Sequence, residues 1–96
     1  MYVLITYDVA TADAAGRKRL RHIAKVCLDY GQRVQNSVFE CKVDIVQLLK
    51  LKNKLLEIMD TEHDSIRVYN LGRNWQNNVE HYGQKQPYNP EGTLIV

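Results

Sequence analysis

Runs of apolar residues along the chain predict short strands, and one of these runs opens the sequence. The segment YVLITYDV, residues 2–9, is apolar at almost every position. Successive side chains of a strand point to opposite faces, which divides the residues into two sets: Tyr2, Leu4, Thr6 and Asp8 on one face, and Val3, Ile5 and Tyr7 on the other. A strand that is apolar on both faces is typically central and covered on both sides.

Helical periodicity predicts two helices. In the first, Leu20, Ile23, Ala24 and Cys27 recur at helical spacing, Thr11 or Asp13 serves as the N-cap, and Gly31 ends the helix. In the second, Asp44 is the expected N-cap, with Gln47 three residues later as in a capping box. The buried stripe of this second helix comprises Leu48, Leu51, Leu55, Ile58 and Met59.

The order of these segments predicts an α+β fold. Residues 32–43, QRVQNSVFECKV, contribute two strands around a tight turn or bulge at 35–37, and residues 65–71, SIRVYNL, contribute the next strand. The resulting βαββαβ order is that of the ferredoxin-like arrangement, with two helices on one face of a four-stranded antiparallel sheet. Residues 1–72 therefore form the expected domain. Residues 73–96 form a polar tail with short C-terminal strands at 79–82 and 93–96.

Two helices cover only one face of such a sheet. The other face carries Leu4, Thr6 and alternate residues of 65–71, and an apolar face of this kind should not remain wet. We therefore expect a homodimer that packs sheet against sheet, with residues 73–96 packing on the partner. A two-fold axis brings equivalent residues together, so the single Asp8 of each chain becomes a pair of carboxylates in the dimer.

The charge of the chain is unevenly distributed. The net charge of the 96 residues is only +2, but residues 14–33 contain six basic side chains against the single acid Asp29. A local patch of this kind attracts phosphates, although charge runs are also common as plain solvated surface. The candidate nucleic-acid-binding residues are Arg17, Lys18, Arg19, Arg21, Lys25 and Arg33.

Several other classes of protein are not expected. No apolar stretch is long enough to span a membrane, and the chain opens directly on a strand pattern rather than a signal peptide. Cys27 and Cys41 lie in apolar periodic segments, which indicates buried free thiols and a cytoplasmic location. The three histidines have no zinc spacing, and neither a P-loop nor a dinucleotide-binding motif is visible.

Three blocks of sequence together resemble one family. They are LITYDV at residues 4–9, GRKRLRHIAKVCLDYG at 16–31 and QRVQNSVFEC at 32–41. In order and spacing they resemble the small CRISPR-associated Cas2 proteins, which accompany the spacer integrase. Beyond residue 41 the resemblance rests on length and on the order of strands and helices.

The resemblance implies a ferredoxin-like homodimer that holds a divalent metal between the two copies of the strand-end aspartate, here Asp8. The metal is usually Mg²⁺, with Mn²⁺ as an alternative. Members of the family are metal-dependent endonucleases acting on RNA or DNA, and the same dimer bridges integrase subunits during spacer acquisition. The matching positions of interest are Tyr7, Asp8, Arg17, Arg19, Arg33 and Phe39. Many members carry a second acid shortly after the aspartate, whereas here DVATAD offers none before Asp13.

Each candidate also has a simpler interpretation. An aspartate that ends a strand is often a turn or cap residue, Arg33 a plain strand arginine and Phe39 a core aromatic. Two ionised Asp8 carboxylates would repel each other, and a shared magnesium ion, which needs few protein oxygens, would remove that repulsion. The bound ion would polarise a phosphate and lower the pKa of an attacking water.

Three functions remain open from the sequence. The first is a magnesium-dependent endonuclease with Asp8 as metal ligand and catalytic residue, supported by Tyr7 and Phe39. The second is a non-catalytic, DNA-bridging subunit that assembles with the integrase. The third is a toxin-like ribonuclease of the same fold. Base stacking by Tyr69, Trp75, Tyr82 and Tyr88 is a minor alternative, because QRVQNSVFEC lacks the aromatic sheet motif of RNA-recognition domains.

Overall fold

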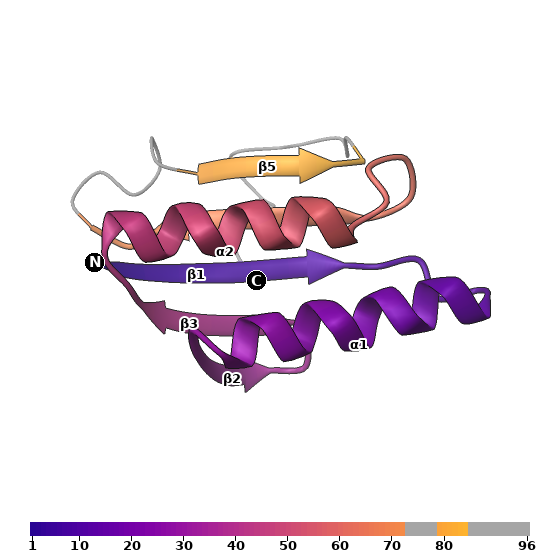
Figure 1. Cartoon of the computed structure of the whole chain (residues 1–96), viewed down its shortest axis with the longest axis horizontal. Helices are drawn as coiled ribbons and strands as arrows, with labels where there is room; N and C mark the ends of the chain where they lie inside the picture. Colours follow the sequence, from indigo (N-terminus) through magenta and orange to yellow (C-terminus); the bar gives the residue numbers. More distant parts are fainter. Residues whose placement is uncertain (73–78, 85–96) are drawn as a thin grey trace, which may run out of the picture.

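The computed structural model describes residues 1–72 and 79–84 of the chain (Figure 1). The elements follow one another as β1 (Tyr2–Asp8), α1 (Ala14–Leu28), β2 (Gly31–Gln35), β3 (Val38–Lys42), α2 (Ile45–Ile58), β4 (Ser65–Asn70) and β5 (Val79–Gly83). The expected βαββαβ order is confirmed. Among the described residues, no helix is both long and apolar enough to cross a membrane.

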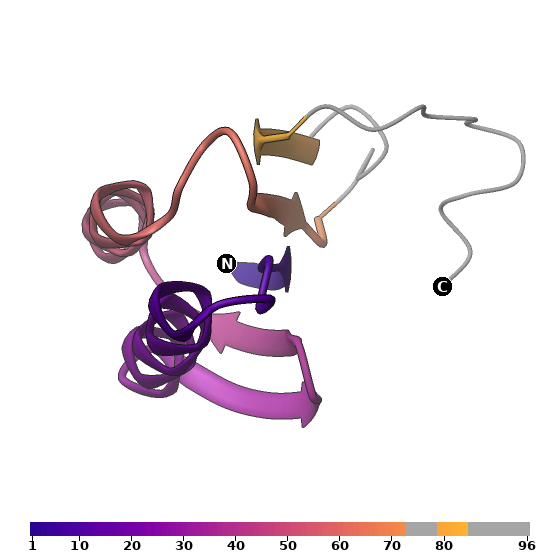
Figure 2. The ribbon, with the colours of Figure 1, turned by 90° about the vertical axis from the view of Figure 1, so that its right-hand side faces the viewer.

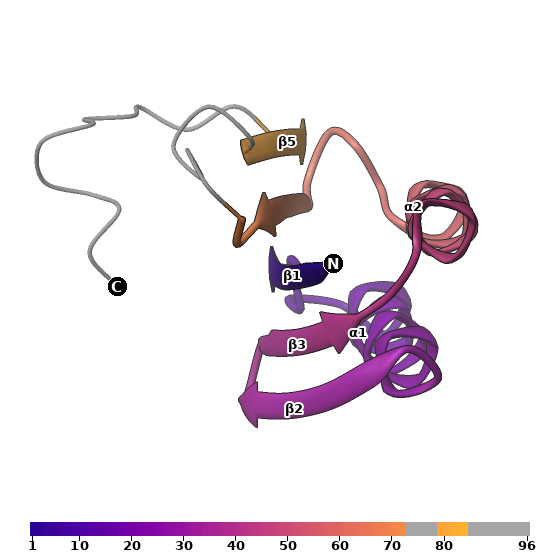
Figure 3. The same ribbon diagram turned by 90° about the vertical axis from the view of Figure 1, so that its left-hand side faces the viewer.

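The strands form one antiparallel sheet of five strands in the order β2-β3-β1-β4-β5. The central position of β1 agrees with its apolar sequence. Both helices lie on the same side of the sheet, as the edge-on views in Figures 2 and 3 show. The opposite side, called the open face below, is covered by no helix of the described chain.

The C-terminal strand extends the sheet of its own chain. Residues of β5 pair with β4 from Ser65 opposite Gly83 to Tyr69 opposite Val79. The expected strand at 79–82 is therefore confirmed, one residue longer than predicted. The expected strand at 93–96 lies outside the described residues, and the packing of 73–96 on a partner stays a prediction.

The core lies between the helices and the inward face of the sheet. On β1 this face carries Val3, Ile5 and Tyr7, all buried, and Leu51 of α2 is fully buried as well. Cys27 also lies in this core, where burial raises the pKa of its thiol to about 12, so it behaves as a small apolar side chain.

The two sets of β1 side chains therefore have different surroundings. On the open face, Leu4 and Thr6 are half-buried, while Tyr2 is 51% exposed and Asp8 is exposed. Among the described residues, only the helix side of β1 is covered. The expectation that a partner chain covers the open face stays a prediction.

The ends of the helices follow local sequence signals, with one exception. Asp13 is the N-cap of α1, its Oδ1 accepting from the Gly16 N–H at 2.8 Å. The prediction that Gly31 ends α1 is wrong, because the helix ends at Leu28 and Gly31 opens β2. A Cβ at Gly31 would lie 2.2 Å from the Glu40 carbonyl oxygen, so strand packing accounts for this glycine.

The predicted capping box of α2 is confirmed. The Gln47 N–H donates to Asp44 Oδ1 at 2.8 Å, and the Asp44 N–H donates to Gln47 Oε1 at 2.9 Å. The predicted stripe is buried except for Ile58, which is half-buried. This stripe holds α2 over the sheet beside α1.

Candidate functional site

Asp8 occupies the last position of the central strand and points to the open face. It pairs with Ser65 of β4, and its side chain is exposed. Within residues 1–72 and 79–84, the Asp8 carboxylate makes no hydrogen bond or ion pair. A carboxylate of this kind is available to a ligand, whereas a turn or cap aspartate would be engaged with backbone N–H groups.

Two rows of side chains cross the open face at this end of the sheet. One row joins Asp8, Ser65 and Gly83, and the next joins Thr6, Arg67 and His81. Arg67 Nε donates to His81 Nδ1 at 3.2 Å, while His81 Nε2 lies 2.7 Å from the Gln84 carbonyl oxygen and so carries the ring proton. Arg67 thus lies one row from Asp8 on the same face.

The position of Arg67, one row from Asp8 on the open face, was not predicted from the sequence. The available signal was the alternation of SIRVYNL, in which Ile66 and Val68 are buried and Arg67 faces the other way. The register that sets Arg67 beside Asp8 comes from strand pairing, which the sequence does not state.

Asp64, a buried carboxylate with no solvent exposure, directly precedes Ser65, the β4 partner of Asp8. Arg19 binds it through two nitrogens, Nε to Oδ2 at 2.8 Å and Nη2 to Oδ1 at 3.3 Å. The N–H groups of Ala10 and Asp60 donate to it at 3.1 and 2.9 Å. Burial would raise the pKa of Asp64, but these hydrogen bonds outweigh burial and hold its pKa below the ordinary value.

The other basic residues of α1 form an exposed surface. The basic stripe, as it is called below, comprises Arg17, Lys18, Arg21 and Lys25, all exposed. These residues lie on the outer side of α1, away from the buried residues that contact the sheet. Arg17 Nη1 also donates to the Thr11 carbonyl oxygen at 3.4 Å.

The structure does not bring the basic stripe and Asp8 together in one chain. The stripe lies on the outer side of α1, on the helix side of the sheet, whereas the alternation of side chains along β1 turns Asp8 to the open face. Nucleic-acid binding by the residues of the stripe stays a prediction. Arg19, also predicted to bind nucleic acid, directs its guanidinium to Asp64.

Arg33, Phe39 and Tyr7 lie together on the helix side of the sheet. The Arg33 guanidinium carbon is 5.2 Å from the centre of the Phe39 ring, and the rings of Tyr7 and Phe39 stack with centroids 6.1 Å apart. Phe39 is fully buried, as a core aromatic would be, while Arg33 is exposed. Burial raises the pKa of the Tyr7 hydroxyl. Arg33 is therefore accessible, whereas Tyr7 and Phe39 contribute to packing.

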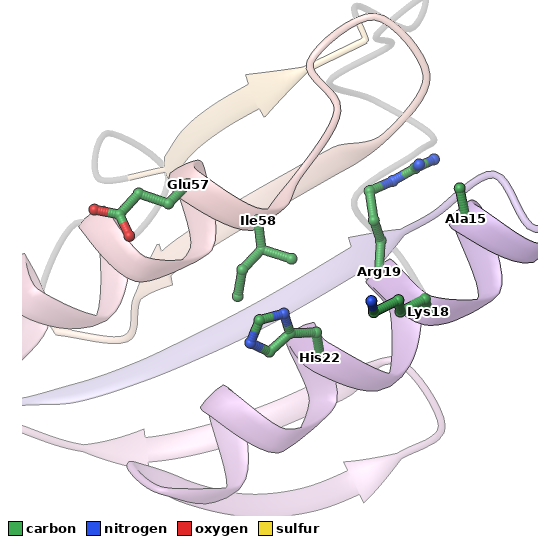
Figure 4. A pocket seen from close by; sticks show the side chains of 6 residues that line it. All are labelled: Ala15, Lys18, Arg19, His22, Glu57 and Ile58. Atoms are coloured by element: carbon green, nitrogen blue, oxygen red, sulfur yellow. The ribbon is translucent and has the colours of Figure 1, made fainter.

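A shallow groove lies between the two helices (Figure 4). Its lining residues are Ala15, Lys18, Arg19 and His22 from α1 and Glu57 and Ile58 from α2. Lys18 joins this groove to the basic stripe, so the positive surface continues from the outer side of α1 into the groove.

One acidic cluster lies in the turn after α2. Ligand atoms of Asp60, Glu62 and His63 come within 4.8 Å of one another. Internal hydrogen bonds account for this arrangement, since His63 Nδ1 lies 2.9 Å from Asp60 Oδ2 and the Glu62 N–H donates to Asp60 Oδ1 at 3.0 Å. His63 lowers the pKa of Asp60, and Asp60 raises the pKa of His63. The cluster is therefore part of the hydrogen-bonded turn that leads to Asp64.

Comparison with known proteins identifies the family. Residues 1–79 match the family described as CRISPR associated protein Cas2. The chain belongs to the Cas2 family. This confirms the resemblance that residues 4–41 carry, and it extends the match beyond them.

Relatives cover this Cas2-family chain from end to end. A protein of Chlorobaculum tepidum is 62% identical over 96 residues, covering 100% of both chains, and one of Nitratidesulfovibrio vulgaris is 60% identical over 96 residues, covering 100% of this chain and 94% of the relative. Both are named CRISPR-associated endoribonuclease Cas2. A relative from Halalkalibacterium halodurans, 56% identical over 95 residues and covering 99% of each chain, is named CRISPR-associated endonuclease Cas2.

A solved Cas2 structure has the same fold. The crystal structure of Streptococcus pyogenes Cas2 at pH 6.5 aligns with a TM-score of 0.71 at 60% sequence identity, covering 86% of this chain and 100% of that one. The predicted fold class is therefore confirmed by the structure and by this Cas2 neighbour.

Proposed function

We propose that this Cas2-family chain is the subunit of a metal-dependent endonuclease that hydrolyses phosphodiester bonds in RNA or DNA. The observation that carries the proposal is the Asp8 carboxylate, exposed at the end of the central strand and without a partner among the described residues. The names of the relatives, endoribonuclease and endonuclease, support the same reaction.

The active species in this proposal is a homodimer formed through the open face. That face carries half-buried Leu4 and Thr6 and no covering helix, so packing against a second copy removes apolar surface from water. A two-fold axis near the end of β1 brings two Asp8 side chains together. Light scattering should therefore give about twice the chain mass of 11.2 kDa at micromolar concentration, and a monomer would contradict this assembly.

The residues at this end of the sheet fit a divalent ion. Mg²⁺ prefers one or two carboxylates and keeps several waters, and two Asp8 carboxylates supply that donor set. When bound, such an ion polarises a phosphate and lowers the pKa of a water. Mn²⁺ fits the same oxygen ligands. In each chain Asp8 would hold the ion, and Arg67, one row away on β4, adds positive charge to the same face.

A second function is favoured by the position of the basic stripe. Because its four residues lie on the opposite side of the sheet from Asp8, nucleic acid bound there is held away from that carboxylate. Such a surface suits a subunit that bridges DNA during spacer acquisition, with an integrase subunit as partner. The two functions are compatible, since one dimer offers both surfaces.

Substitution of Asp8 by Asn tests the nuclease proposal. Asn preserves the size of the side chain but removes two negative charges from the dimer, so cleavage should be lost while nucleic-acid binding remains. Asp13→Asn is the matched control, because it removes the same charge five residues later and Asn is an equally good N-cap. Cleavage that persists in Asp8→Asn, or that is undiminished in EDTA, would refute the proposal.

Mixed dimers test whether one ion is shared. In a dimer with one Asp8→Ala chain, independent sites would keep about half of the activity, whereas a shared ion would lower activity far below half, because one carboxylate holds Mg²⁺ weakly. If Asp8→Asn abolishes cleavage but spacer acquisition persists, the bridging function is the one that acquisition requires.

A further inference from the structure

The buried Asp64 carboxylate connects the segments that surround Asp8. Its four hydrogen bonds come from the β1–α1 loop at Ala10, from α1 at Arg19, which donates twice, and from the turn at Asp60. Its own carbonyl oxygen accepts from the Gln84 N–H at 2.8 Å, next to the end of β5. One side chain with its backbone therefore ties together four separate parts of the chain.

Asp8 lies between two of these connections. Ala10 follows it by two residues on the same strand exit, and Ser65, directly after Asp64, is its partner on β4. The backbone on both sides of the Asp8 carboxylate is thus fixed to the same buried group. A shift of Asp64 would move the strand exit after Asp8 and the strand opposite it.

Arg19 holds Asp64 in place. The guanidinium binds with two nitrogens to the two different carboxylate oxygens, which fixes the rotation of the carboxyl group as well as its position. Only 21% of the Arg19 side chain is exposed and none of the Asp64 side chain, in contrast to the exposed basic stripe on the same helix. A lysine would keep the charge but not the two-pronged geometry.

We infer that Arg19 and Asp64 are positioning residues for Asp8, and that Arg19 serves the reaction through this ion pair rather than by binding phosphate. The inference deepens the proposed function, on which it rests. The basic stripe binds the nucleic-acid backbone, and the Arg19–Asp64 pair sets the distance between the two carboxylates that hold the ion.

The test compares two identical substitutions on one helix. Arg19→Lys keeps the charge and breaks the bidentate contact, and Arg21→Lys makes the same change on the exposed stripe. We expect Arg19→Lys to lower kcat by roughly 10- to 100-fold, because small misplacements of a reacting group are costly, with little change in KM. Any loss in Arg21→Lys should appear in KM and in nucleic-acid affinity, because Arg21 belongs to the phosphate-binding stripe. The control for kcat is Lys50→Arg, a change of the same size at an exposed position of α2 outside the stripe, which should leave kcat within about twofold of that of the unaltered protein.

Two further measurements do not require cleavage. The first is the salt dependence of duplex DNA binding in EDTA, where Arg19→Lys and Arg19→Gln should both keep the slope of the unaltered protein and Arg21→Gln should flatten it. The second is amide hydrogen exchange, where Arg19→Lys should speed exchange of the Ala10 N–H, whose acceptor is Asp64 Oδ1.

The inference is overturned if Arg19→Gln flattens the salt slope as Arg21→Gln does, or if Arg19→Lys retains full kcat. If Arg19→Lys fails to fold, hydrogen exchange is measured in the unaltered protein. An Ala10 N–H that exchanges as fast as an exposed loop amide would show that Asp64 does not hold the loop after Asp8, and would overturn the inference. The two proposals fail separately. Absence of cleavage in the unaltered protein refutes the nuclease, while binding slopes and Ala10 exchange still report on Arg19.

Discussion

Removal of three charges from the basic stripe should change how nucleic-acid binding depends on salt. The perturbation is the triple substitution of Arg17, Arg21 and Lys25 by Gln, three exposed residues spaced four apart along α1. Gln is nearly as good a helix former as Arg or Lys, so α1 should persist. The net charge of the chain falls from +2 to −1.

The expected magnitude follows from counterion release. Each neutralised phosphate on duplex DNA contributes about −0.9 to the slope of log affinity against log salt, so three lost contacts should make the slope of each chain shallower by up to about 2.7. Between 50 and 200 mM salt, a difference of that size corresponds to roughly a 40-fold change in relative affinity. Because contacts to phosphate carry no base information, the loss should be the same for unrelated sequences.

Fluorescence anisotropy with labelled duplexes of two unrelated sequences, in EDTA so that no cleavage occurs, measures these slopes. The matched control replaces Lys42, Lys50 and Lys54 by Gln, which removes the same charge from exposed positions on β3 and α2. If both triple variants flatten the slope equally, net charge alone explains binding and the stripe has no special role. An unchanged slope in the stripe variant would show that α1 is merely solvated.

Three further predictions concern stability. Gly83→Ala should destabilise the fold by about 1–3 kcal/mol in urea unfolding, because Gly83 has a φ of +97° and a Cβ there would lie 2.1 Å from the Asp64 carbonyl oxygen. Gly72→Ala should be nearly neutral, because among the described residues a Cβ there would meet only the Asn70 side-chain oxygen, at 3.4 Å. Equal effects at the two glycines would contradict this. Asp44→Ala removes the capping box of α2 and should cost about 1 kcal/mol, which a thermal melt resolves; a variant as stable as the parent would argue against the cap. The pKa of Asp64 is lower in the folded state than the unfolded value of about 3.9. Ionised Asp64 therefore adds to the free energy of unfolding above that pH, and this stabilisation is lost as the pH falls through the folded pKa. Urea unfolding between pH 5 and 2 should show the free energy of unfolding falling with pH, and Asp64→Asn should reduce this dependence.

Local signals in the sequence were enough for most of the fold. The Asp44–Gln47 capping box, the stripe of Leu48, Leu51 and Leu55, and the apolar segment of β1 depend on neighbours within a few residues. Each therefore appears in the structure where the pattern places it. Gly31 was misjudged because a glycine after a helix usually caps it, whereas here the approach of β3 decides.

The surroundings of Asp8 could not be predicted in the same way. Arg19 and Asp64 are 45 residues apart, and each resembles an ordinary surface charge until the fold brings them together. The basic stripe follows Asp8 closely in sequence, but closeness in sequence does not decide the side of the sheet on which a residue lies. Strand alternation turns Asp8 to the open face, however, while α1 crosses to the other side.

The connection between Asp64 and Gln84 has a consequence for biosynthesis. Ribosomes make the chain from its N-terminus, so Asp8, Arg19 and Asp64 emerge before Gln84, whose N–H donates to the Asp64 carbonyl oxygen. Until Gly83 and Gln84 leave the exit tunnel, the edge of β4 is unpaired and a partner chain on a neighbouring ribosome meets an incomplete surface. Completion of the Asp8 end of the sheet is thus tied to the emergence of residues 83 and 84. A chain released early, before residue 83, would carry the family motifs of the first forty residues without the finished sheet edge that supports them.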